Sequence, residues 1–174
     1  LINSVYKPKV LYKNIFSRSL PLEEVDIYVC GFPCQSFSII GKQRGFEDSR
    51  GIVFFECLKT ISVLKPRVFI LENVKHLINH DSGKTFKTIL QSLEELSVYN
   101  IYWKVLNTKE FGIPQNRPRV YIVGVLKTFD NGFLFPNPLN IETKIDDFLQ
   151  KEDLPVSTLT EKQSIYQEQR MSTK

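Results

Sequence analysis

Residues 25–30 read VDIYVC, and this stretch decides the fold class. It is rich in β-branched and aromatic side chains, and Gly31 and Pro33 follow it directly. A short apolar run between turn residues predicts a buried strand. Working outward along the chain, similar runs predict strands at residues 68–71, 101–106 and 120–125, with a weaker strand at residues 10–12.

Two amphipathic segments lie between these runs. Residues 52–63 are predicted to form a helix that ends before Pro66, and a second helix is expected from Gly83 to about Leu96. Apolar strands that alternate with helices indicate βαβ units, and therefore an α/β fold with a mainly parallel sheet covered on both faces. Because ligands bind at the carboxyl ends of such strands, we expect the chemistry in residues 31–51, 72–79 and 111–119.

The composition is that of an ordinary globular domain. The chain has 174 residues, 42% hydrophobic and 24% charged, which excludes disordered and collagen-like classes. No apolar run approaches the roughly 18 residues of a membrane span, and the sequence does not start as a signal peptide does. Three cysteines are too few for a disulfide framework, so an intracellular location in the cytoplasm, nucleoid or nucleus is expected. The net charge of +4 permits an anionic partner.

The most informative loop reads GFPCQSFS, at residues 31–38. Cys34 lies in a Gly/Pro turn after a strand, where a thiolate could act as a nucleophile. On position alone, a small buried side chain is an equally good interpretation. Cys30 and Cys57 fall within an apolar strand and an apolar helix, and we predict that both belong to the core.

Charged residues follow or precede two other strands. Glu72 comes directly after an apolar strand, where it could act as an acid or could cap the next helix. Arg117 and Arg119 enter a strand with spacing two, so they share one face and could bind a carbonyl or an anion. Surface arginines are the simpler interpretation of this pair alone.

A metal site is the weaker alternative for the region around Glu72. Glu72, His76 and His80 are spaced four apart and would share a face if they lay on one helix. Because Glu72 ends a predicted strand instead, we expect the histidines to lie on a loop or on a helix surface.

In their order along the chain, these motifs resemble the central signature of the cytosine-C5 DNA methyltransferases of bacterial restriction-modification systems. The matching segments are Pro33-Cys34-Gln35, Glu72-Asn73-Val74 and Gln115-x-Arg117-x-Arg119, with Asp48-Ser49-Arg50-Gly51 and Phe54-Phe55 between the first two. The likeness runs from about residue 11 to residue 138. Relatives that modify transfer RNA usually carry a second proline where this chain has Phe32. The resemblance implies a Rossmann-like core that uses S-adenosyl-L-methionine and is incomplete at both ends.

The resemblance also implies a mechanism. Cys34 attacks C6 of a cytosine that is flipped out of duplex DNA, and Glu72 protonates or hydrogen-bonds N3 of this base. Arg119 holds O2 of the base, and Arg117 supports the segment around Cys34, called the cysteine segment below. The methyl group of S-adenosylmethionine then joins C5. The implied substrate- and DNA-binding residues are Phe32, Pro33, Gln35, Ser36, Ser38, Lys42, Arg44, Arg50, Asn73, Val74 and Gln115, and the implied cofactor-binding residues are Asn14, Ile15, Pro33 and Val53. No metal ligand is implied.

Some of the family's segments have no counterpart in these residues. The glycine-rich cofactor loop is missing, Asn14 stands where an aspartate would meet the adenine amino group, and a target-recognition domain is not found. We therefore expect residues 1–140 to form a partial catalytic domain and residues 141–174 a linker or the start of a target-recognition region. The chain alone is expected to be inactive. The alternatives are a transfer-RNA cytosine-C5 methyltransferase, and a non-catalytic or split subunit that binds a complementary subunit.

Overall fold

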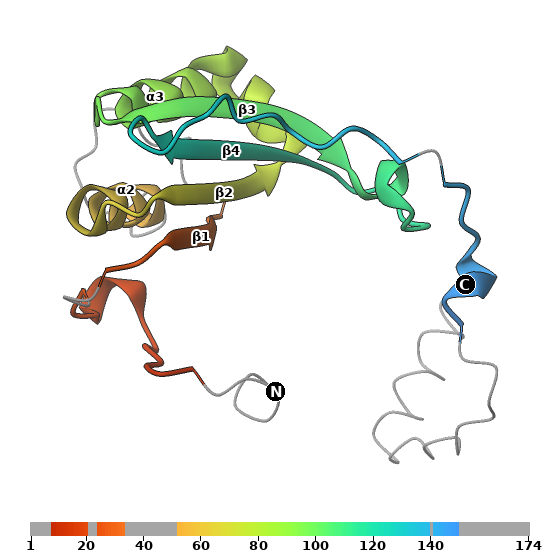
Figure 1. Cartoon of the computed structure of the whole chain (residues 1–174), viewed down its shortest axis with the longest axis horizontal. Coiled ribbons are helices and arrows are strands. Elements are labelled where there is room, and N and C mark those ends of the chain that lie inside the picture. Colours follow the sequence, from red (N-terminus) through yellow and green to blue (C-terminus); the bar gives the residue numbers. More distant parts are fainter. Residues whose placement is uncertain (1–7, 21–23, 34–51, 140, 150–174) are drawn as a thin grey trace, which may run out of the picture. The chain divides into compact units, whose positions relative to one another are not determined.

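The computed structural model describes residues 8–20, 24–33, 52–139 and 141–149 (Figure 1). The chain divides into two compact units, Leu1–Ile141 and Glu142–Lys174. Within the described residues, the first contains a four-stranded sheet and two α-helices. In the second, the described part includes the short 3₁₀ turn Ile145–Asp147.

All four of the strong strand predictions are confirmed, with small shifts at the ends. The strands are β1 (Ile27–Gly31), β2 (Val68–Val74), β3 (Tyr99–Asn107) and β4 (Pro118–Leu126). The weaker strand predicted at residues 10–12 is wrong. Val10 and Leu11 are exposed coil, and no strand in the described part of the chain pairs with their backbone.

The sheet has the order β1-β2-β4-β3 and is mixed, as Figure 1 shows. β1 and β2 are parallel, but β4 is antiparallel to both of its neighbours. The prediction of a mainly parallel sheet is therefore wrong for the described residues, although the α/β class is correct. The reason is the short connection between β3 and β4, residues 108–117. A parallel crossover needs a dozen or more residues, so this connection forms a hairpin.

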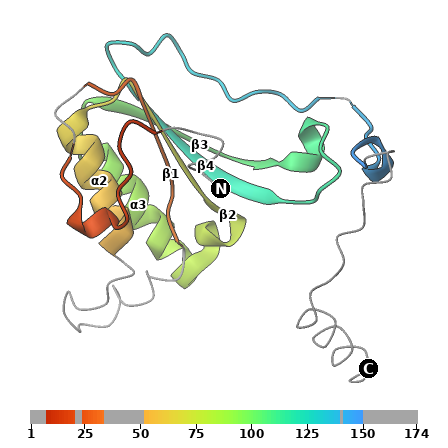
Figure 2. The same ribbon diagram turned by 90° about the horizontal axis from the view of Figure 1, so that it is seen from below.

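The two α-helices of the described ranges lie on the same side of the sheet, as Figure 2 shows. They are α2 (Ile52–Leu64) and α3 (Lys84–Glu94), close to the predicted ranges. In α2 the buried side chains of Phe54, Cys57 and Ile61 repeat at helical spacing, and the helix ends where Lys65 takes a φ of 45° before Pro66. No helix in the described ranges is both long enough and apolar enough to cross a membrane.

The core lies between this helical layer and one face of the sheet. Phe69 and Leu71 of β2 and Val120 and Ile122 of β4 point into it, together with the buried side chains of α2 and α3. Alternate residues on the same strands therefore point to the opposite face, and Glu72 is one of them. Glu72 and Arg119 of the site lie on this second face, whereas Asn73 is buried on the core face.

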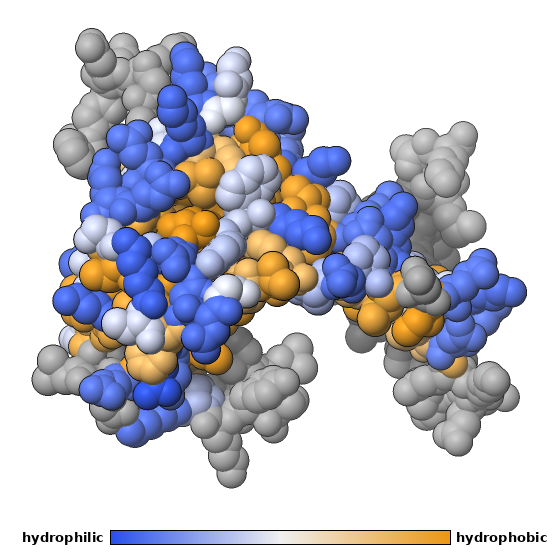
Figure 3. All heavy atoms as spheres, turned by 45° about the horizontal axis from the view of Figure 1, so that its top comes forward, coloured by the Kyte–Doolittle hydropathy of each residue, from blue (hydrophilic) through white to orange (hydrophobic). Residues whose placement is uncertain are grey.

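Outside the core, apolar side chains also reach the surface. Figure 3 shows apolar surface in patches between hydrophilic side chains. Ile27 and Val29, on the second face of β1, are 59% and 66% exposed. On the other edge of the sheet, Trp103 packs edge-on against Phe86 and remains partly exposed.

Candidate active site

The candidate site lies at one edge of the sheet, where β1 and β2 end and β4 begins. Gly31, the last residue of β1, is in register with Glu72 of β2. Two residues further along β2, Val74 is in register with Arg119 of β4. Since residues two apart on a strand share a face, Glu72 and Arg119 lie on the same face and are diagonal neighbours.

Glu72 and Arg119 form an ion pair. The Nε atom of Arg119 lies 2.8 Å from Oε1 of Glu72, and the two side chains are 18% and 33% exposed respectively. Nη1 of Arg119 also donates to the carbonyl oxygen of Pro118, at 2.9 Å. The guanidinium is thus held by two contacts, and it fixes the orientation of the carboxylate.

The second carboxylate oxygen of Glu72 points towards the end of β1. A Cβ atom placed on Gly31 would lie 3.2 Å from this Oε2 atom. That is a tight approach, so a side chain at position 31 would press against the carboxylate. Gly31 therefore lets Glu72 lie beside the backbone that continues towards Cys34.

Asn73 of β2 binds the backbone of Phe32, which follows β1. Its Nδ2 atom donates to the carbonyl oxygen of Phe32 at 2.8 Å, and its Oδ1 atom accepts from the N–H of Val74 at 2.8 Å. The Asn73 side chain is buried, at 4% exposure, so water does not replace these bonds. Phe32 is also buried and packs on Phe54 of α2, with 5.5 Å between ring centroids. These contacts fix the point from which the cysteine segment starts.

Replacing Asn73 with alanine is expected to destabilise the fold. The carbonyl of Phe32 would lose its amide donor in a buried position, which costs about 1–3 kcal/mol. Urea unfolding followed by circular dichroism would measure this loss. Asn131→Ala removes an exposed asparagine and is the matched control, with an expected effect within about 0.5 kcal/mol. If both variants unfold at the same urea concentration, the Asn73 bond does not stabilise the segment.

Several predicted site residues lie outside the described residues. These are Cys34, Gln35, Ser36, Ser38, Lys42, Arg44 and Arg50. Pro33, the last described residue before them, is exposed. For this set the sequence-based roles stay predictions.

Arg117 and Gln115 lie in the loop that leads into β4. The side chain of Arg117 is exposed, and its backbone N–H donates to Oδ1 of Asn107 at 2.9 Å. Thr108 donates its hydroxyl to the carbonyl oxygen of Gln115, at 2.5 Å. These bonds tie the loop to the end of β3, while the Arg117 side chain lies outside the Glu72–Arg119 pair.

The predicted cofactor residues come from two neighbouring elements. Asn14 caps the 3₁₀ turn Ile15–Ser17, and its Oδ1 atom accepts from the N–H of Phe16 at 2.9 Å. Ile15 and Val53 are half-buried and pack on the core. An amide oxygen has two lone pairs, so Oδ1 can accept a second donor such as an adenine amino group. The exposed amide beside apolar side chains is thus compatible with an adenine.

The spacing of Glu72, His76 and His80 does not produce one helical face. Glu72 lies within β2, whereas both histidines lie in the 3₁₀ segment Lys75–Gly83. Nδ1 of His80 lies 2.7 Å from the hydroxyl of Thr85, and His76 is exposed. Among the residues that the structure describes, no three His, Cys, Asp or Glu side chains gather as metal ligands would.

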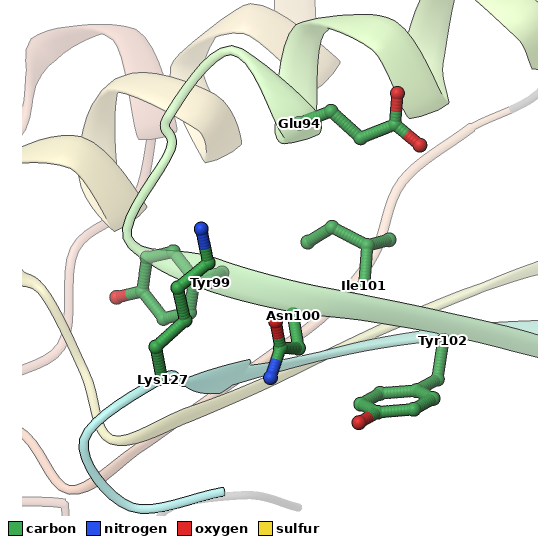
Figure 4. Close-up of a pocket in the computed structure, with 6 residues that line it drawn as sticks. All are labelled: Glu94, Tyr99, Asn100, Ile101, Tyr102 and Lys127. Carbon is green, nitrogen blue, oxygen red and sulfur yellow. The ribbon is translucent and has the colours of Figure 1, made fainter.

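A pocket of about 530 Å³ lies on the edge strand, away from these residues (Figure 4). It is lined by Glu94, Tyr99, Asn100, Ile101, Tyr102 and Lys127. None of these is a predicted site residue, and Lys127 already donates to the carbonyl oxygen of Ser97 at 2.6 Å.

Known proteins share extended sequence similarity with this chain. The family model described as C-5 cytosine-specific DNA methylase matches residues 8–174, nearly the whole chain. The chain belongs to this family. The family resemblance seen in the sequence is thereby confirmed.

Two of the similar curated relatives of this methylase chain come from bacteria. Type II methyltransferase M.NgoBI of Neisseria gonorrhoeae is 47% identical over 127 residues, which is 73% of this chain and 39% of the relative. Type II methyltransferase M.Bsp6I of Bacillus sp. (strain RFL6) is 45% identical over 157 residues, 86% of this chain and 49% of the relative. The methylase chain thus spans less than half the length of these relatives.

Solved structures confirm the fold class. The structure of the Entamoeba histolytica methyltransferase EhMeth matches with a TM-score of 0.58 at 23% identity, covering 86% of this chain and 48% of that one. A putative DNA modification methyltransferase from E. coli matches with a TM-score of 0.53 at 22% identity, covering 70% of this chain and 33% of that one. At these identities the likeness concerns the fold alone. The α/β methyltransferase core predicted from the sequence is therefore correct, with a mixed sheet.

Proposed function

We propose that the protein carrying this chain transfers a methyl group from S-adenosylmethionine to C5 of cytosine in duplex DNA. The observation that carries the proposal is the Glu72–Arg119 pair at the end of β1, beside the backbone that leads to Cys34. A carboxyl group and a cation at one end of the strands, with Cys34 next in sequence after Pro33, suit attack on a pyrimidine. Family membership and relatives called Type II methyltransferases support this reaction over the modification of transfer RNA.

In the proposed mechanism Cys34 is the nucleophile. Its thiolate sulfur forms a bond to C6 of cytosine, and the electrons of the C5–C6 double bond move through the ring towards N3. Glu72, protonated, donates its proton to N3 and so neutralises the charge that develops there. C5 becomes an enamine-like carbon that can attack an electrophile. The C5 proton is then lost to water, the C5–C6 double bond re-forms and the C6–S bond breaks, which releases Cys34 as a thiolate. N3 returns its proton to the Glu72 carboxylate, so the acid is regenerated.

Arg119 has two functions in this proposal. Its Nε atom orients Glu72, and its remaining N–H groups are available for O2 of the base. Because O2 and N3 are adjacent on the ring, one Glu–Arg pair can contact both atoms. Arg117 stays proposed as a support for the cysteine segment.

The cofactor would lie against Asn14, Ile15, Pro33 and Val53. When bound, S-adenosylmethionine supplies an electrophilic methyl group. The amide of Asn14 would accept from the adenine amino group, while Ile15 and Val53 would contact the apolar face of the adenine.

The proposed DNA contacts come from three segments. Asn73 and Phe32 set the position of the cysteine segment, as their hydrogen bond indicates. Pro33, Val74 and Gln115 would border the extruded base, since a base inside a duplex is out of reach. Gln35, Ser36, Ser38, Lys42, Arg44 and Arg50 are proposed to contact the base and the phosphates around it.

Trapping of a covalent adduct tests the reaction directly. The substrate is duplex DNA of mixed sequence with 5-fluorocytosine in place of cytosine, so that many possible recognition sequences are present. The fluorine at C5 cannot leave as a proton does, so the covalent adduct persists. With S-adenosylmethionine present, the protein carrying this chain is expected to become covalently attached to this DNA. Mass spectrometry of the digested adduct should locate the attachment at Cys34. Attachment to fluorinated transfer RNA alone would instead support the RNA alternative.

The 174-residue chain alone is proposed to be inactive. The same assay on the isolated chain should give no adduct and no transfer of labelled methyl groups. If activity appears only after a second polypeptide is added, the chain is one part of a split enzyme. Methyl transfer by the chain alone would contradict this part of the proposal.

A further inference from the structure

Two cysteines that the sequence assigned separately to the core lie in contact. Sγ of Cys30, in β1, is 3.1 Å from Sγ of Cys57, in α2. Both are free thiols. Cys57 is fully buried, whereas Cys30 is only partly buried and can meet small solutes. The contact arises because Cys30 lies on the face of β1 that the helices cover.

The surroundings of this pair make the two thiols unequal. A hydrogen bond from Cys57 and then one from Tyr28, together with the positive charge of Arg18, lower the pKa of Cys30 to about 7 despite its burial. The same hydrogen bond, along with burial, raises the pKa of Cys57. Between the two sulfurs, ionisation is therefore favoured at Cys30 rather than at Cys57.

A hydrogen bond to α2 holds the side chain of Arg18. Its Nη2 atom donates to the hydroxyl of Thr60, one helical turn beyond Cys57 on α2. Its Nε atom is buried and has no hydrogen-bond partner in the structure. The positive charge of Arg18 lowers the pKa of Cys30 and so favours the thiolate of that residue.

We propose that Cys30 and Cys57 form a peroxide-sensitive redox pair. The Cys30 thiolate attacks one oxygen of hydrogen peroxide, the O–O bond breaks, and hydroxide leaves while Cys30 becomes a sulfenic acid. The thiol of Cys57 then loses its proton and attacks the Cys30 sulfur. An S–S bond forms and the sulfenic oxygen leaves as water, so one peroxide oxidises two thiols.

The distance between the sulfurs permits this bond. An S–S bond is about 2.05 Å long, so the sulfurs have to approach by only about 1 Å. The product would join β1 to α2. Because disulfides in reducing compartments are transient, cellular thiols would reverse it. The inference does not depend on methyl transfer or on Cys34.

A Cys34→Ser variant of the full 174-residue chain isolates the pair. Cys30 and Cys57 are then the only thiols, since the sequence has three cysteines. After treatment with hydrogen peroxide and blocking of free thiols, trypsin should release residues 19–42 linked to residues 51–59, and dithiothreitol should separate them. The yield in denaturing guanidinium should fall at least tenfold, because the fold holds the sulfurs together. Equal yields, or thiols that stay reduced in the folded chain, would overturn the proposal.

Two further variants assign the roles of the sulfurs. In the Cys34→Ser background, Cys57→Ser removes the second thiol, so Cys30 should accumulate as a sulfenic acid that dimedone labels. With Cys30→Ser in the same background, the buried Cys57 should stay unlabelled. Labelling of Cys57 with Cys30 unreacted would show that the assignment of nucleophile and partner is wrong.

Discussion

Replacing Glu72 with glutamine is expected to lower methyl transfer to duplex DNA by about 10²–10⁴-fold, the range typical of removing a general acid. Glutamine has nearly the same shape, and its amide oxygen can still accept from Nε of Arg119. It cannot deliver a proton to N3 of cytosine. The substitution therefore tests whether proton donation by Glu72 is needed, while the position of the side chain is kept. Single-turnover transfer of labelled methyl groups by the protein carrying this chain would measure the loss.

The matched control is a second Asp/Glu–Arg pair, formed by the residues that immediately precede β1 and β2. Asp26 and Arg67 form an ion pair of 3.2 Å whose side chains are 73% and 58% exposed. It lies at the opposite ends of β1 and β2 from Glu72. Asp26→Asn should leave methyl transfer unchanged, because exposed pairs contribute little to stability. If Glu72→Gln costs no more activity than Asp26→Asn, Glu72 is not the proton donor.

The residues of the site could be predicted, but their contact could not. Glu72 and Arg119 each stood next to an apolar strand, so both could be placed at strand ends from the sequence. Their 2.8 Å contact depends on β4 lying antiparallel beside β2. Ten residues between β3 and β4 exclude a helical crossover, and that length was the signal for a hairpin. Strand order, however, depends on which faces pack together and is not encoded in any single segment.

Asn73 and the two cysteines illustrate the same limit. Asn73 was predicted to bind substrate or DNA, and its hydrogen bond to the Phe32 carbonyl gives it a structural role in addition. The prediction that Cys57 is a core residue is confirmed, and Cys30 is partly buried against the core. Their mutual contact joins residues 27 positions apart in sequence. The periodicity of the sequence predicts which face of each helix or strand is buried. Which residues of two elements then contact each other depends on how the elements pack together.

Gly124 shows how closely that packing constrains the sequence, and Gly124→Ala is expected to destabilise the fold by about 3 kcal/mol or more. In β4, Gly124 is in register with Phe69 of β2. A Cβ atom at position 124 would lie 2.1 Å from Cε1 of the Phe69 ring. The ring is fully buried and packs edge-on against Tyr99, with 5.0 Å between centroids, so it has little room to move. Urea unfolding would measure the loss.

Restoring space should separate this steric cause from any other effect of the substitution. Phe69→Leu alone leaves a cavity and should also destabilise the fold, as large-to-small core changes do. In the double variant, however, the new methyl group occupies part of the space that the ring vacates. The two losses should therefore fall short of additivity by about 1 kcal/mol or more, as expected for residues in direct contact. Additive losses would mean that the Phe69 ring is not what excludes a side chain at position 124. The glycine would then matter for the backbone of β4 itself.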